Sequence, residues 1–397
     1  MNINLNLKRL MAAALLSSFT TLVVASTDEH AQAPEVSAAD AKLSFWDMPY
    51  LEEAFIDTVP DKRKDGLSVG KLRLEGKDKS HLIKVANEIA NNREGKFDSM
   101  LISYKDNLIF ESYYKRGRVD LPHFQASVTK AYVSIAIGRA IQLGYLTMAD
   151  LNKPLVSFIN NIALEKLADG AEKITLHQAM RMSSGVRVSD DKLKLIMDSS
   201  SKITGTNITQ ELLQHTKAIS PTAQTFKYQD ADPRMTMQVL NSVVPGSAKD
   251  FIKNEVLAKI GITHYDWKND INGLPIPEST SNMTSRDMIK FGQLILNKGK
   301  WKGEQLISEA FITKATNGET KPTEEWIPDS FLYGYFWYQT EMKVDNKSYT
   351  ARFAWGGGEQ YILTVEQLDL VVVFTAHARE NNTMQLMAEN ILPVFIK

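Results

Sequence analysis

Two side chains that could cooperate in acyl transfer stand three positions apart, where a polar segment gives way to an apolar one. Ser127 and Lys130 lie in "QASVTKAYVSIAIGRAI", and residues 131–141 are almost entirely apolar. A serine becomes a strong nucleophile when a neighbouring base takes its proton. A buried lysine can be that base, because burial disfavours its charged form. The pair therefore suggests nucleophilic catalysis.

The same Ser-x-x-Lys spacing occurs four more times, so context has to select one pair. The other pairs begin at Ser68, Ser112, Ser189 and Ser199. Ser112 falls in a predicted strand, where residues i and i+3 point to opposite faces, and the other three lie in loop-like or charged stretches. Only Ser127 opens an apolar helix, in which i and i+3 share a face and the N-terminus favours a developing negative charge. The alternative interpretation is that Ser127 merely caps this helix.

Other catalytic chemistries lack their residues. The sequence contains no cysteine and no Gly-x-Ser-x-Gly motif, which excludes disulfides, zinc–thiolate sites and the usual α/β-hydrolase nucleophile. Its seven histidines, among them His123, His177 and His377, are scattered outside metal-binding spacings. "WGGGEQ" lies between strand-like segments and is not a dinucleotide fingerprint. We expect no metal and no organic cofactor.

Composition places the chain among ordinary globular proteins. It has 397 residues, 43% hydrophobic and 23% charged, with a net charge of −1. This length suits one large domain or two ordinary ones. Because no global positive field exists, binding to nucleic acid or acidic lipid is not expected. The expected partner is a small molecule, and nothing fixes an oligomeric state.

The N-terminus has the pattern of a secretory signal peptide. Lys8 and Arg9 precede an apolar stretch from Leu10 to Ala25, with small residues at Val23 and Ala25. The stretch is short for a membrane span and contains several hydroxyl side chains. We predict a signal peptide at 1–25, a flexible leader at 26–45 and export, to the periplasm in a Gram-negative cell. An uncleaved amphipathic tail is the alternative.

Apolar spacing predicts three blocks of secondary structure. The first holds a helix at 78–92, a hairpin at 98–115 around Asp106–Asn107, and a helix at 127–146 ending at Gly144. The middle, 147–285, is mainly helical, without a strand ladder. The last block follows in the order helix from 284, strands at 331–341, 348–365 and 368–376, and helix at 383–396.

This order predicts an α+β fold, because hairpin-like strands at both ends favour one antiparallel sheet. We expect 46–146 and 285–397 to form the sheet domain, sandwiched by helices. Residues 147–284 would form an all-helical subdomain, with the active site between the two.

Several segments in the same order resemble one known family. Over residues 45–397 the chain is similar to the penicillin-recognising serine hydrolases, and more narrowly to the class C β-lactamase-related branch. The resemblance implies a β-lactamase/transpeptidase-like fold. It rests on "SVTKAYVSIAIGRAIQLGYLTMADLNKPLVSFI", "ITLHQAMRMSSGV", "FKYQDAD", "MTSRDMIKFGQLILNKGKWKGEQLIS" and "FAWGGGEQYILTVEQLDLVVVFT".

The resemblance implies roles for individual residues. Ser127 would be the nucleophile that forms an acyl-enzyme, and Lys130 would share or accept its proton. Tyr228 would be the partner acid–base group. Whether Lys130 or Tyr228 is the acylation base stays open. Backbone N–H groups of Ser127 and Gly358 would form the oxyanion hole.

Two departures from the family pattern bear on the substrate. Asp230 stands where Asn is usual, and ionised Asp only accepts hydrogen bonds. Trp355, Gly356 and Gly357 stand where the family has Lys-Thr-Gly or His-Thr-Gly. These residues cannot offer a cation or a hydroxyl to a substrate carboxylate. Arg352 would point to the opposite face of the strand. The glycines could alternatively mark a bulge with close backbone packing.

The sequence therefore favours a secreted serine hydrolase that cleaves an ester or a small amide. The Trp-Gly-Gly version resembles the esterases and the 6-aminohexanoate-dimer hydrolases of this branch. A β-lactamase or DD-peptidase is the second hypothesis. A non-catalytic sensor that kept the fold is the third, and the retained Ser127, Lys130 and Tyr228 argue against it.

Overall fold

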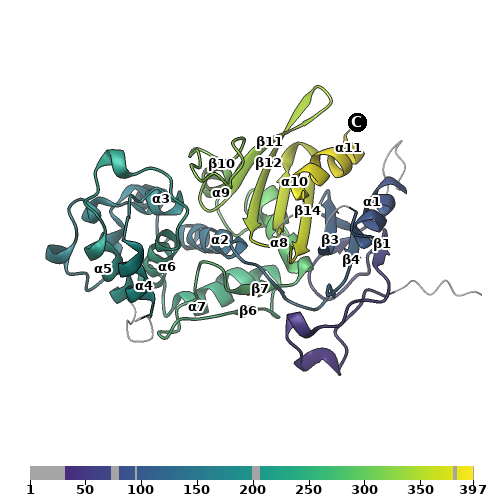
Figure 1. Ribbon diagram of the computed structural model, residues 1–397, viewed down its shortest axis with the longest axis horizontal. Helices are drawn as coiled ribbons and strands as arrows, with labels where there is room; N and C mark the ends of the chain where they lie inside the picture. The colour runs from purple at the N-terminus through teal and green to yellow at the C-terminus, as the bar shows by residue number, and fades with distance from the viewer. Residues whose placement is uncertain (1–31, 73–79, 94–95, 199–205, 379–381, 397) are drawn as a thin grey trace, which may run out of the picture. The chain divides into compact units, whose positions relative to one another are not determined.

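An antiparallel sheet forms the centre of the structure and combines strands from the N-terminal and C-terminal parts of the chain (Figure 1). The computed structural model describes residues 32–72, 80–93, 96–198, 206–378 and 382–396. The strand order is β1-β4-β3-β14-β13-β12-β11-β10, and β2 adds a parallel pairing with β4. The strands are β1 (Phe55–Asp57), β2 (Ser68–Val69), β3 (Phe97–Tyr104), β4 (Asn107–Tyr113), β10 (Leu332–Tyr333), β11 (Tyr338–Val344), β12 (Lys347–Gly356), β13 (Gln360–Val365) and β14 (Leu370–Ala376).

Helices cover both faces of this sheet, which is why its central strands are buried on both sides. Every residue of β13 and β14 is buried, whereas β11, nearer the edge, alternates buried and exposed residues. A strand needs alternation only when one of its faces meets water. The predicted α+β fold, with one antiparallel sheet covered by helices, is confirmed.

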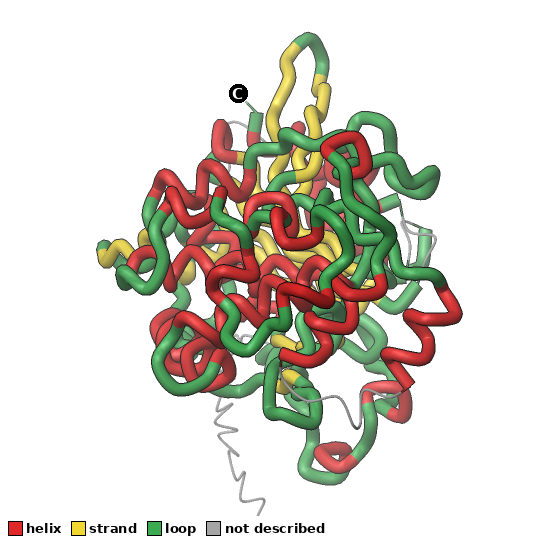
Figure 2. The backbone as a smooth tube through the Cα atoms, turned by 90° about the vertical axis from the view of Figure 1, so that its left-hand side faces the viewer, coloured by secondary structure: helices red, strands yellow, loops and turns green. Residues whose placement is uncertain are grey.

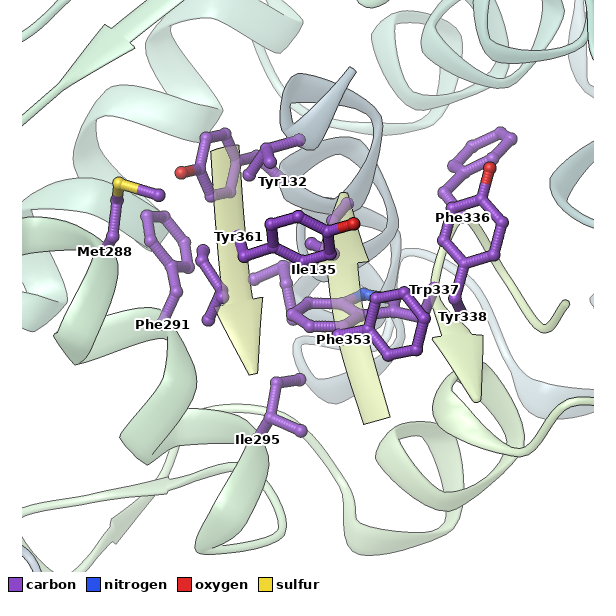
Figure 3. Close-up of a cluster of buried hydrophobic side chains, with 14 of the residues drawn as sticks. Tyr132, Ile135, Met288, Phe291, Ile295, Phe336, Trp337, Tyr338, Phe353 and Tyr361 are labelled. Carbon is purple, nitrogen blue, oxygen red and sulfur yellow. The ribbon is translucent and has the colours of Figure 1, made fainter. Parts of the chain in front are cut away.

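Two long helices pack on one face of the sheet. They are α2 (Val128–Gln142) and α8 (Ser285–Leu296). Figure 3 shows their aromatic contact, in which Tyr132 of α2 stacks on Phe291 of α8 with ring centroids 4.3 Å apart. The opposite face is covered by α1 (Ser80–Ala90) and by the C-terminal helices α10 (Thr383–Leu386), η11 (Met387–Ile391) and α11 (Leu392–Phe395) (Figure 1).

The middle of the chain is helical and packs on α2 chiefly through α6. Figure 2 shows these helices on the side nearest the viewer, with the strands behind them. Residues 33–397 form one compact unit, so the division into two subdomains stays a prediction. The remaining α-helices are α3 (Leu176–Met180), α4 (Asp190–Asp198), α5 (Thr206–His215), α6 (Ala231–Val243), α7 (Ala248–Phe251) and α9 (Glu309–Thr316).

Short helical turns link these elements. One, η8 (Ile252–Leu257), is a π-helix, as is η11. The 3-10 turns are η1 (Asp40–Lys42), η2 (Phe45–Asp47), η3 (Met148–Asn152), η4 (Leu155–Phe158), η5 (Leu164–Lys166), η6 (Ala171–Lys173), η7 (Pro221–Ala223), η9 (Ala258–Ile260) and η10 (Glu366–Leu368).

Two local predictions need correction. The β3–β4 turn is formed by Lys105 and Asp106, with φ of 50° and 60°, whereas Asn107 already pairs with Tyr104. A two-residue hairpin turn of this type needs positive φ at both positions. The region 147–285 also contains strands, which are too short to leave a periodic pattern. They are β6 (Asp266–Trp267) and β7 (Ser281–Met283), which join β5 (His123–Phe124) in a small sheet. Beyond this region, β8 (Lys300–Trp301) pairs with β9 (Glu304–Gln305).

Part of the predicted flexible leader lies against the fold. The Val36 N–H donates to the Asp120 carboxylate at 2.9 Å, and the Val119 N–H donates to the Pro34 carbonyl at 2.9 Å. Phe45 packs edge-on against His123. Pro34, Val36 and Phe45 thus contact the fold, and the flexible leader at 26–45 stays a prediction. The predicted signal peptide lies outside the described residues, and within them no helix is long and apolar enough to cross a membrane.

Two helices end at glycines with left-handed backbone, which allows a matched test. Gly144 follows α2 with φ of +81°, and a Cβ there would meet nothing within 4 Å. Gly299 follows α8 with φ of +84°, and a Cβ there would lie 2.0 Å from the Ile307 carbonyl oxygen. Both positions favour glycine for its positive φ, but only Gly299 also needs glycine for space.

We therefore expect Gly144→Ala to lower the free energy of unfolding by about 1 kcal/mol, the usual strain of a left-handed alanine. Gly299→Ala should cost about 1–3 kcal/mol more, because the methyl group overlaps backbone that cannot rotate away. Urea unfolding of both variants measures the difference. Equal losses of stability would contradict the close approach at Gly299.

A carboxylic acid is buried in the first turn of α6. Asp232 is fully buried and accepts a hydrogen bond from the side-chain amide of Gln229. Burial raises the pKa of Asp232 to about 7, although hydrogen bonds from Gln229 and Ser184 oppose the rise. The folded protein thus holds this proton in a pH range where the unfolded chain, with a carboxyl pKa of about 3.9, has lost it.

The sign of the effect follows from proton linkage. Because the folded state binds more protons between pH 4 and 7, the contribution of Asp232 to stability is present below pH 4 and is lost as the pH rises through 7. Over that interval the stability of the wild-type protein should fall by up to about 4 kcal/mol more than that of Asp232→Asn. Urea unfolding at several pH values measures both slopes, and parallel curves would refute the prediction.

Candidate active site

The backbone before α2 makes a strained turn that places Ser127 at the helix N-terminus. Ala126 has a φ of 46°, unusual for a residue other than glycine. Ser127 itself has helical angles, and its side chain makes no capping hydrogen bond. Its Oγ instead accepts a hydrogen bond from Lys130 Nζ at 3.2 Å. This geometry favours the catalytic interpretation of Ser127 over the capping one.

The start of α2 is fixed to strand β7. The Gln125 N–H donates to the Ser281 carbonyl at 2.9 Å, and the hydroxyls of Thr129 and Ser281 are 2.7 Å apart. These contacts hold the turn around Ala126 against strand β7. The position of Ser127 therefore depends on tertiary contacts as well as on the helix itself.

Lys130 is buried and is held by neutral oxygens. Its side chain is 3% exposed, and Nζ donates to the Glu278 carbonyl at 2.8 Å as well as to Ser127. The Asp230 carboxylate lies 3.8 Å from Nζ, too far for a short hydrogen bond. Lys130 therefore contacts Ser127 without being fully engaged by a carboxylate, the arrangement that a proton-sharing lysine needs.

Tyr228 lies over Lys130 with its ring. Lys130 Nζ is 5.0 Å from the ring centroid, within the range of a cation–π contact. The Tyr228 backbone N–H donates to the Glu324 side chain. Within the described part of the chain, the Tyr228 hydroxyl has no hydrogen bond to Ser127 or Lys130. The structure thus brings Tyr228 to the predicted dyad, and its role in proton transfer stays a prediction.

Asp230 stands at the mouth of the site. Its side chain is 62% exposed and, although it precedes α6, it makes no capping hydrogen bond. Among the residues that the structure describes, its carboxylate makes one ion pair, with Lys130 at 3.8 Å. The carboxylate is therefore available to solvent and to a substrate, where it can act only as an acceptor.

Sequence reasoning missed a buried ion pair behind Lys130. Glu278 is buried and pairs with Arg234 of α6, while its backbone carbonyl accepts the Lys130 hydrogen bond. Burial raises the pKa of Glu278, the Arg234 guanidinium lowers it, and the nearby Asp230 raises it again. Glu278 lies in an irregular segment without periodic pattern, so no signal in the sequence could have found it.

The end of β12 passes directly beside the turn that carries Ser127. Trp355 pairs with Tyr361 and Gly356 pairs with Gln360 across the β12–β13 hairpin. A Cβ on Gly356 would lie 2.4 Å from the Gln125 carbonyl oxygen. Close backbone packing, one of the two interpretations of the glycine run, therefore accounts for Gly356.

The two glycines that follow differ from Gly356. A Cβ on Gly357 would meet nothing within 4 Å, so this position borders open space. Gly358 has a φ of +83°, in the left-handed region that favours glycine. The structure places both at the tip of the hairpin beside the Ser127 turn, and the oxyanion role of the Gly358 N–H stays a prediction.

An aromatic surface flanks the nucleophile. Trp326 lies edge-on to Tyr228 with centroids 5.3 Å apart, and 5.5 Å from the Trp355 ring. Trp355 in turn stacks on Tyr361 at 5.9 Å. Trp326 is 54% exposed, an unusual position for tryptophan. The sequence analysis did not single out Trp326, because it lies in a loop whose path only the fold defines.

Arg352 points away from this surface, as expected from its spacing. Its guanidinium contacts the Asn317 side chain at 3.2 Å and the Glu366 carboxylate at 3.5 Å. It therefore supplies no positive charge at Trp355, and the cation and hydroxyl of the usual family motif have no substitute from this strand.

Comparison with known proteins agrees with the fold and the order of these elements. The β-lactamase family model matches residues 99–394. A putative 6-aminohexanoate-dimer hydrolase from Bacillus anthracis is similar in structure, with a TM-score of 0.61 and 18% identity, covering 91% of this chain and 96% of that one. A search of curated proteins finds no match.

Two further solved structures share the fold. A family VIII carboxylesterase has a TM-score of 0.58 and 13% identity, covering 78% of this chain and 95% of that one. A class C β-lactamase has a TM-score of 0.59 and 14% identity, covering 81% and 98%. The family match spans most of the chain and confirms the predicted resemblance. This chain belongs to the β-lactamase family of serine hydrolases.

Proposed function

We propose that this protein is a secreted hydrolase that cleaves an ester or a small amide through an acyl-enzyme on Ser127. The contact of 3.2 Å between Lys130 Nζ and Ser127 Oγ, made by a lysine that is almost completely buried, carries the proposal. The export signal predicted at residues 1–25 supports secretion.

The geometry suggests the order of events. Lys130 or Tyr228 accepts the proton of Ser127 as Oγ attacks the substrate carbonyl carbon. The N–H groups of Ser127 and Gly358 stabilise the oxyanion, and the N-terminus of α2 adds favourable potential. The leaving alcohol or amine takes the proton, and water then hydrolyses the acyl-enzyme and restores Ser127. No metal or cofactor takes part in this scheme.

The surroundings of Ser127 support a substrate without a carboxylate. Trp355 and Gly356 replace the cation and hydroxyl of the usual motif, and Arg352 is engaged elsewhere. Trp326 and Trp355 offer apolar area beside the nucleophile. Structures named as a carboxylesterase and a 6-aminohexanoate-dimer hydrolase share the fold, which fits this assignment.

A β-lactamase or DD-peptidase is the second candidate. It is favoured by the similar class C β-lactamase and by a penicillin-binding protein homologue from Caulobacter crescentus, with a TM-score of 0.58 and 12% identity over 76% of this chain and 91% of that one. A non-catalytic sensor is the third, and the Lys130–Ser127 contact speaks against it.

Ser127→Ala should abolish hydrolysis of a p-nitrophenyl ester and should leave the thermal unfolding temperature nearly unchanged. The reason is that the hydroxyl supplies the nucleophile, while its one hydrogen bond within the described part of the chain comes from Lys130. We expect the loss in kcat to reach at least about 10³-fold, as for other nucleophile deletions.

Ser68→Ala is the matched control, because Ser68 heads another Ser-x-x-Lys pair and lies exposed on β2. It should keep full activity. A fluorophosphonate probe should label the wild-type protein and the control and should leave Ser127→Ala unlabelled. Undiminished turnover by Ser127→Ala would refute the assignment of the nucleophile.

Substrate preference is tested by offering esters, small amides and the β-lactam nitrocefin to one preparation. We expect kcat/KM for p-nitrophenyl esters to exceed that for nitrocefin by at least about 100-fold, the size of effect expected when a charged substrate group has no partner. Intact-mass measurement shows which substrate leaves an acyl group on the protein. Comparable rates for nitrocefin and esters would favour the second candidate.

A further inference from the structure

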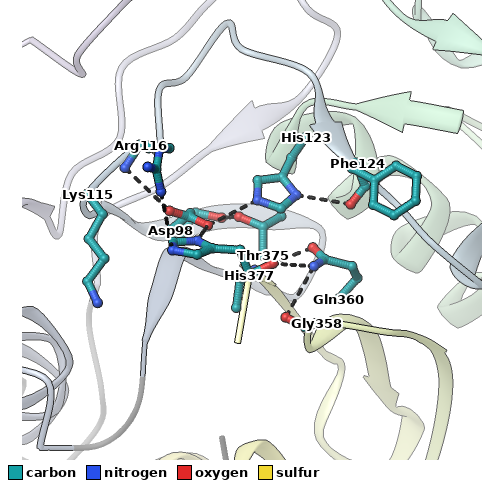
Figure 4. Close-up of polar contacts among 12 residues, drawn as sticks. Asp98, Lys115, Arg116, His123, Phe124, Gly358, Gln360, Thr375 and His377 are labelled. Carbon is teal, nitrogen blue, oxygen red and sulfur yellow. Dashed lines mark hydrogen bonds and ion pairs between the residues drawn. The ribbon is translucent and has the colours of Figure 1, made fainter. Parts of the chain in front are cut away.

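A buried carboxylate beside the candidate site holds two histidines at once (Figure 4). Asp98, at the start of β3, is 0% exposed. Its Oδ2 lies 2.6 Å from His377 Nδ1 and 3.1 Å from His123 Nε2. Its Oδ1 accepts the backbone N–H of Arg116 at 3.3 Å. The residues come from four separate stretches of the chain, so the fold alone brings them together.

The partners of His123 determine its protonation. Nε2 faces the Asp98 carboxylate and Nδ1 faces the Phe124 carbonyl at 3.0 Å. Both partners can only accept hydrogen bonds, so both ring nitrogens have to donate, and only the imidazolium does so. The side chain is 6% exposed, so water cannot take the place of either partner.

The partners of His377 require the opposite state. Nδ1 donates to Asp98, while Nε2 lies 3.5 Å from a guanidinium nitrogen of Arg116, which can only donate. His377 is therefore neutral, with its proton on Nδ1. The cluster consists of the His123 imidazolium, the Asp98 carboxylate between the two rings, and the neutral His377 imidazole. We call it the His123–Asp98–His377 bridge.

The surroundings suit this charge pattern. Burial works to raise the pKa of Asp98, but the hydrogen bonds from His123 and His377 hold it below its ordinary value. One cation, Lys115, acts on the carboxylate through space, while the Arg116 guanidinium lies beside His377. The ring of Phe45 packs edge-on against His123 at 4.6 Å and against His377 at 6.1 Å, which covers the bridge from the N-terminal side.

The bridge joins the two backbone segments that would form the oxyanion hole. His123 belongs to β5, four residues before Ser127, and its carbonyl accepts from the Gln125 side chain at 2.8 Å. His377 follows Ala376, whose carbonyl accepts from the Gln360 side chain. The same Gln360 amide donates to the Gly358 carbonyl at 3.3 Å. A Cβ on Gly358 would lie 3.7 Å from the His377 Cα, so the hairpin tip and the bridge are adjacent.

We propose that His123, Asp98 and His377 are positioning residues, whose charged bridge fixes the spacing between the Ser127 segment and the Gly358 hairpin. The inference rests on the proposed function, because it assumes that these two segments hold the oxyanion. None of the three residues touches the substrate in this scheme. Their effect on rate arises because hydrogen-bond donors displaced by about 1 Å lose much of their catalytic value.

The protonation states can be measured without any activity. Nitrogen-15 NMR of the histidine side chains, assigned by single His→Gln variants, should show His123 protonated on both nitrogens at pH 7 and His377 protonated on Nδ1 alone. In Asp98→Asn the second proton of His123 should be lost at pH 7, because its anionic partner is gone. A neutral His123 in the wild-type protein would overturn the bridge.

The positioning role is tested by kinetics on a p-nitrophenyl ester. Asp98→Asn and His123→Gln should each lower kcat by about 10- to 100-fold while KM changes little. A merely structural role would lower the amount of folded protein and leave the kcat of the folded protein unchanged.

His81→Gln is the matched control, because His81 lies exposed on α1 and, among the described residues, its ring bonds to the Asn390 carbonyl, far from the bridge. It should keep the wild-type kcat and KM. A wild-type kcat in folded Asp98→Asn and His123→Gln would overturn the positioning role while Ser127→Ala is inactive. If Ser127→Ala kept its activity, the proposed function would fail, and the positioning role would fail with it. The histidine protonation states measured by NMR would not change that conclusion.

Discussion

The site depends on one constraint, the burial of Lys130. An amine removed from water needs acceptors for its hydrogen bonds, and the fold supplies the Glu278 carbonyl and the Ser127 hydroxyl. These two acceptors come from a loop of the helical region and from the turn before α2. The ring of Tyr228 covers the same amine from a third segment. Three separate parts of the chain therefore have to be correctly placed before the Lys130 amine has these contacts, and the same placement forms the site.

A second constraint couples the substrate surface to the path of the backbone. Strand β12 approaches the turn before Ser127 so closely that a side chain at Gly356 would overlap the Gln125 carbonyl. Gly356 stands where the family carries a threonine, according to the resemblance seen in the sequence. The glycine at position 356 therefore accounts both for the missing threonine hydroxyl and for the close approach of β12 to the turn before Ser127. Restoring a threonine here would require the strand to move away from the nucleophile.

The sequence predicted those features that follow from local geometry. Ser127 and Lys130 meet because helical spacing brings i and i+3 together wherever the helix lies, and β13 and β14 were recognisable as continuous apolar runs. Glu278 and Trp326 could not be predicted, because they lie in loops and reach the site only through tertiary packing. His123 and His377 are far apart in sequence, and Asp98 unites them only because β14 pairs with β3. The β3–β4 turn was misplaced by one residue, since both Lys105–Asp106 and Asp106–Asn107 fit the composition of a tight turn.

The charges around Lys130 bear on the choice of substrate beyond the loss of a cation at Trp355. The charge of Glu278 is neutralised by Arg234. Two other carboxylates remain, Asp230 near Lys130 and Glu324 near Tyr228. Among the described residues, neither accepts a hydrogen bond from an arginine or a lysine. A substrate carboxylate placed about 4 Å from one of them would meet a repulsion of roughly 1–4 kcal/mol, depending on how much water remains. A neutral ester or amide meets no such cost, and an amine on the substrate would be attracted. The selectivity that we propose would therefore arise as much from repulsion of acids as from the absence of a group to bind them.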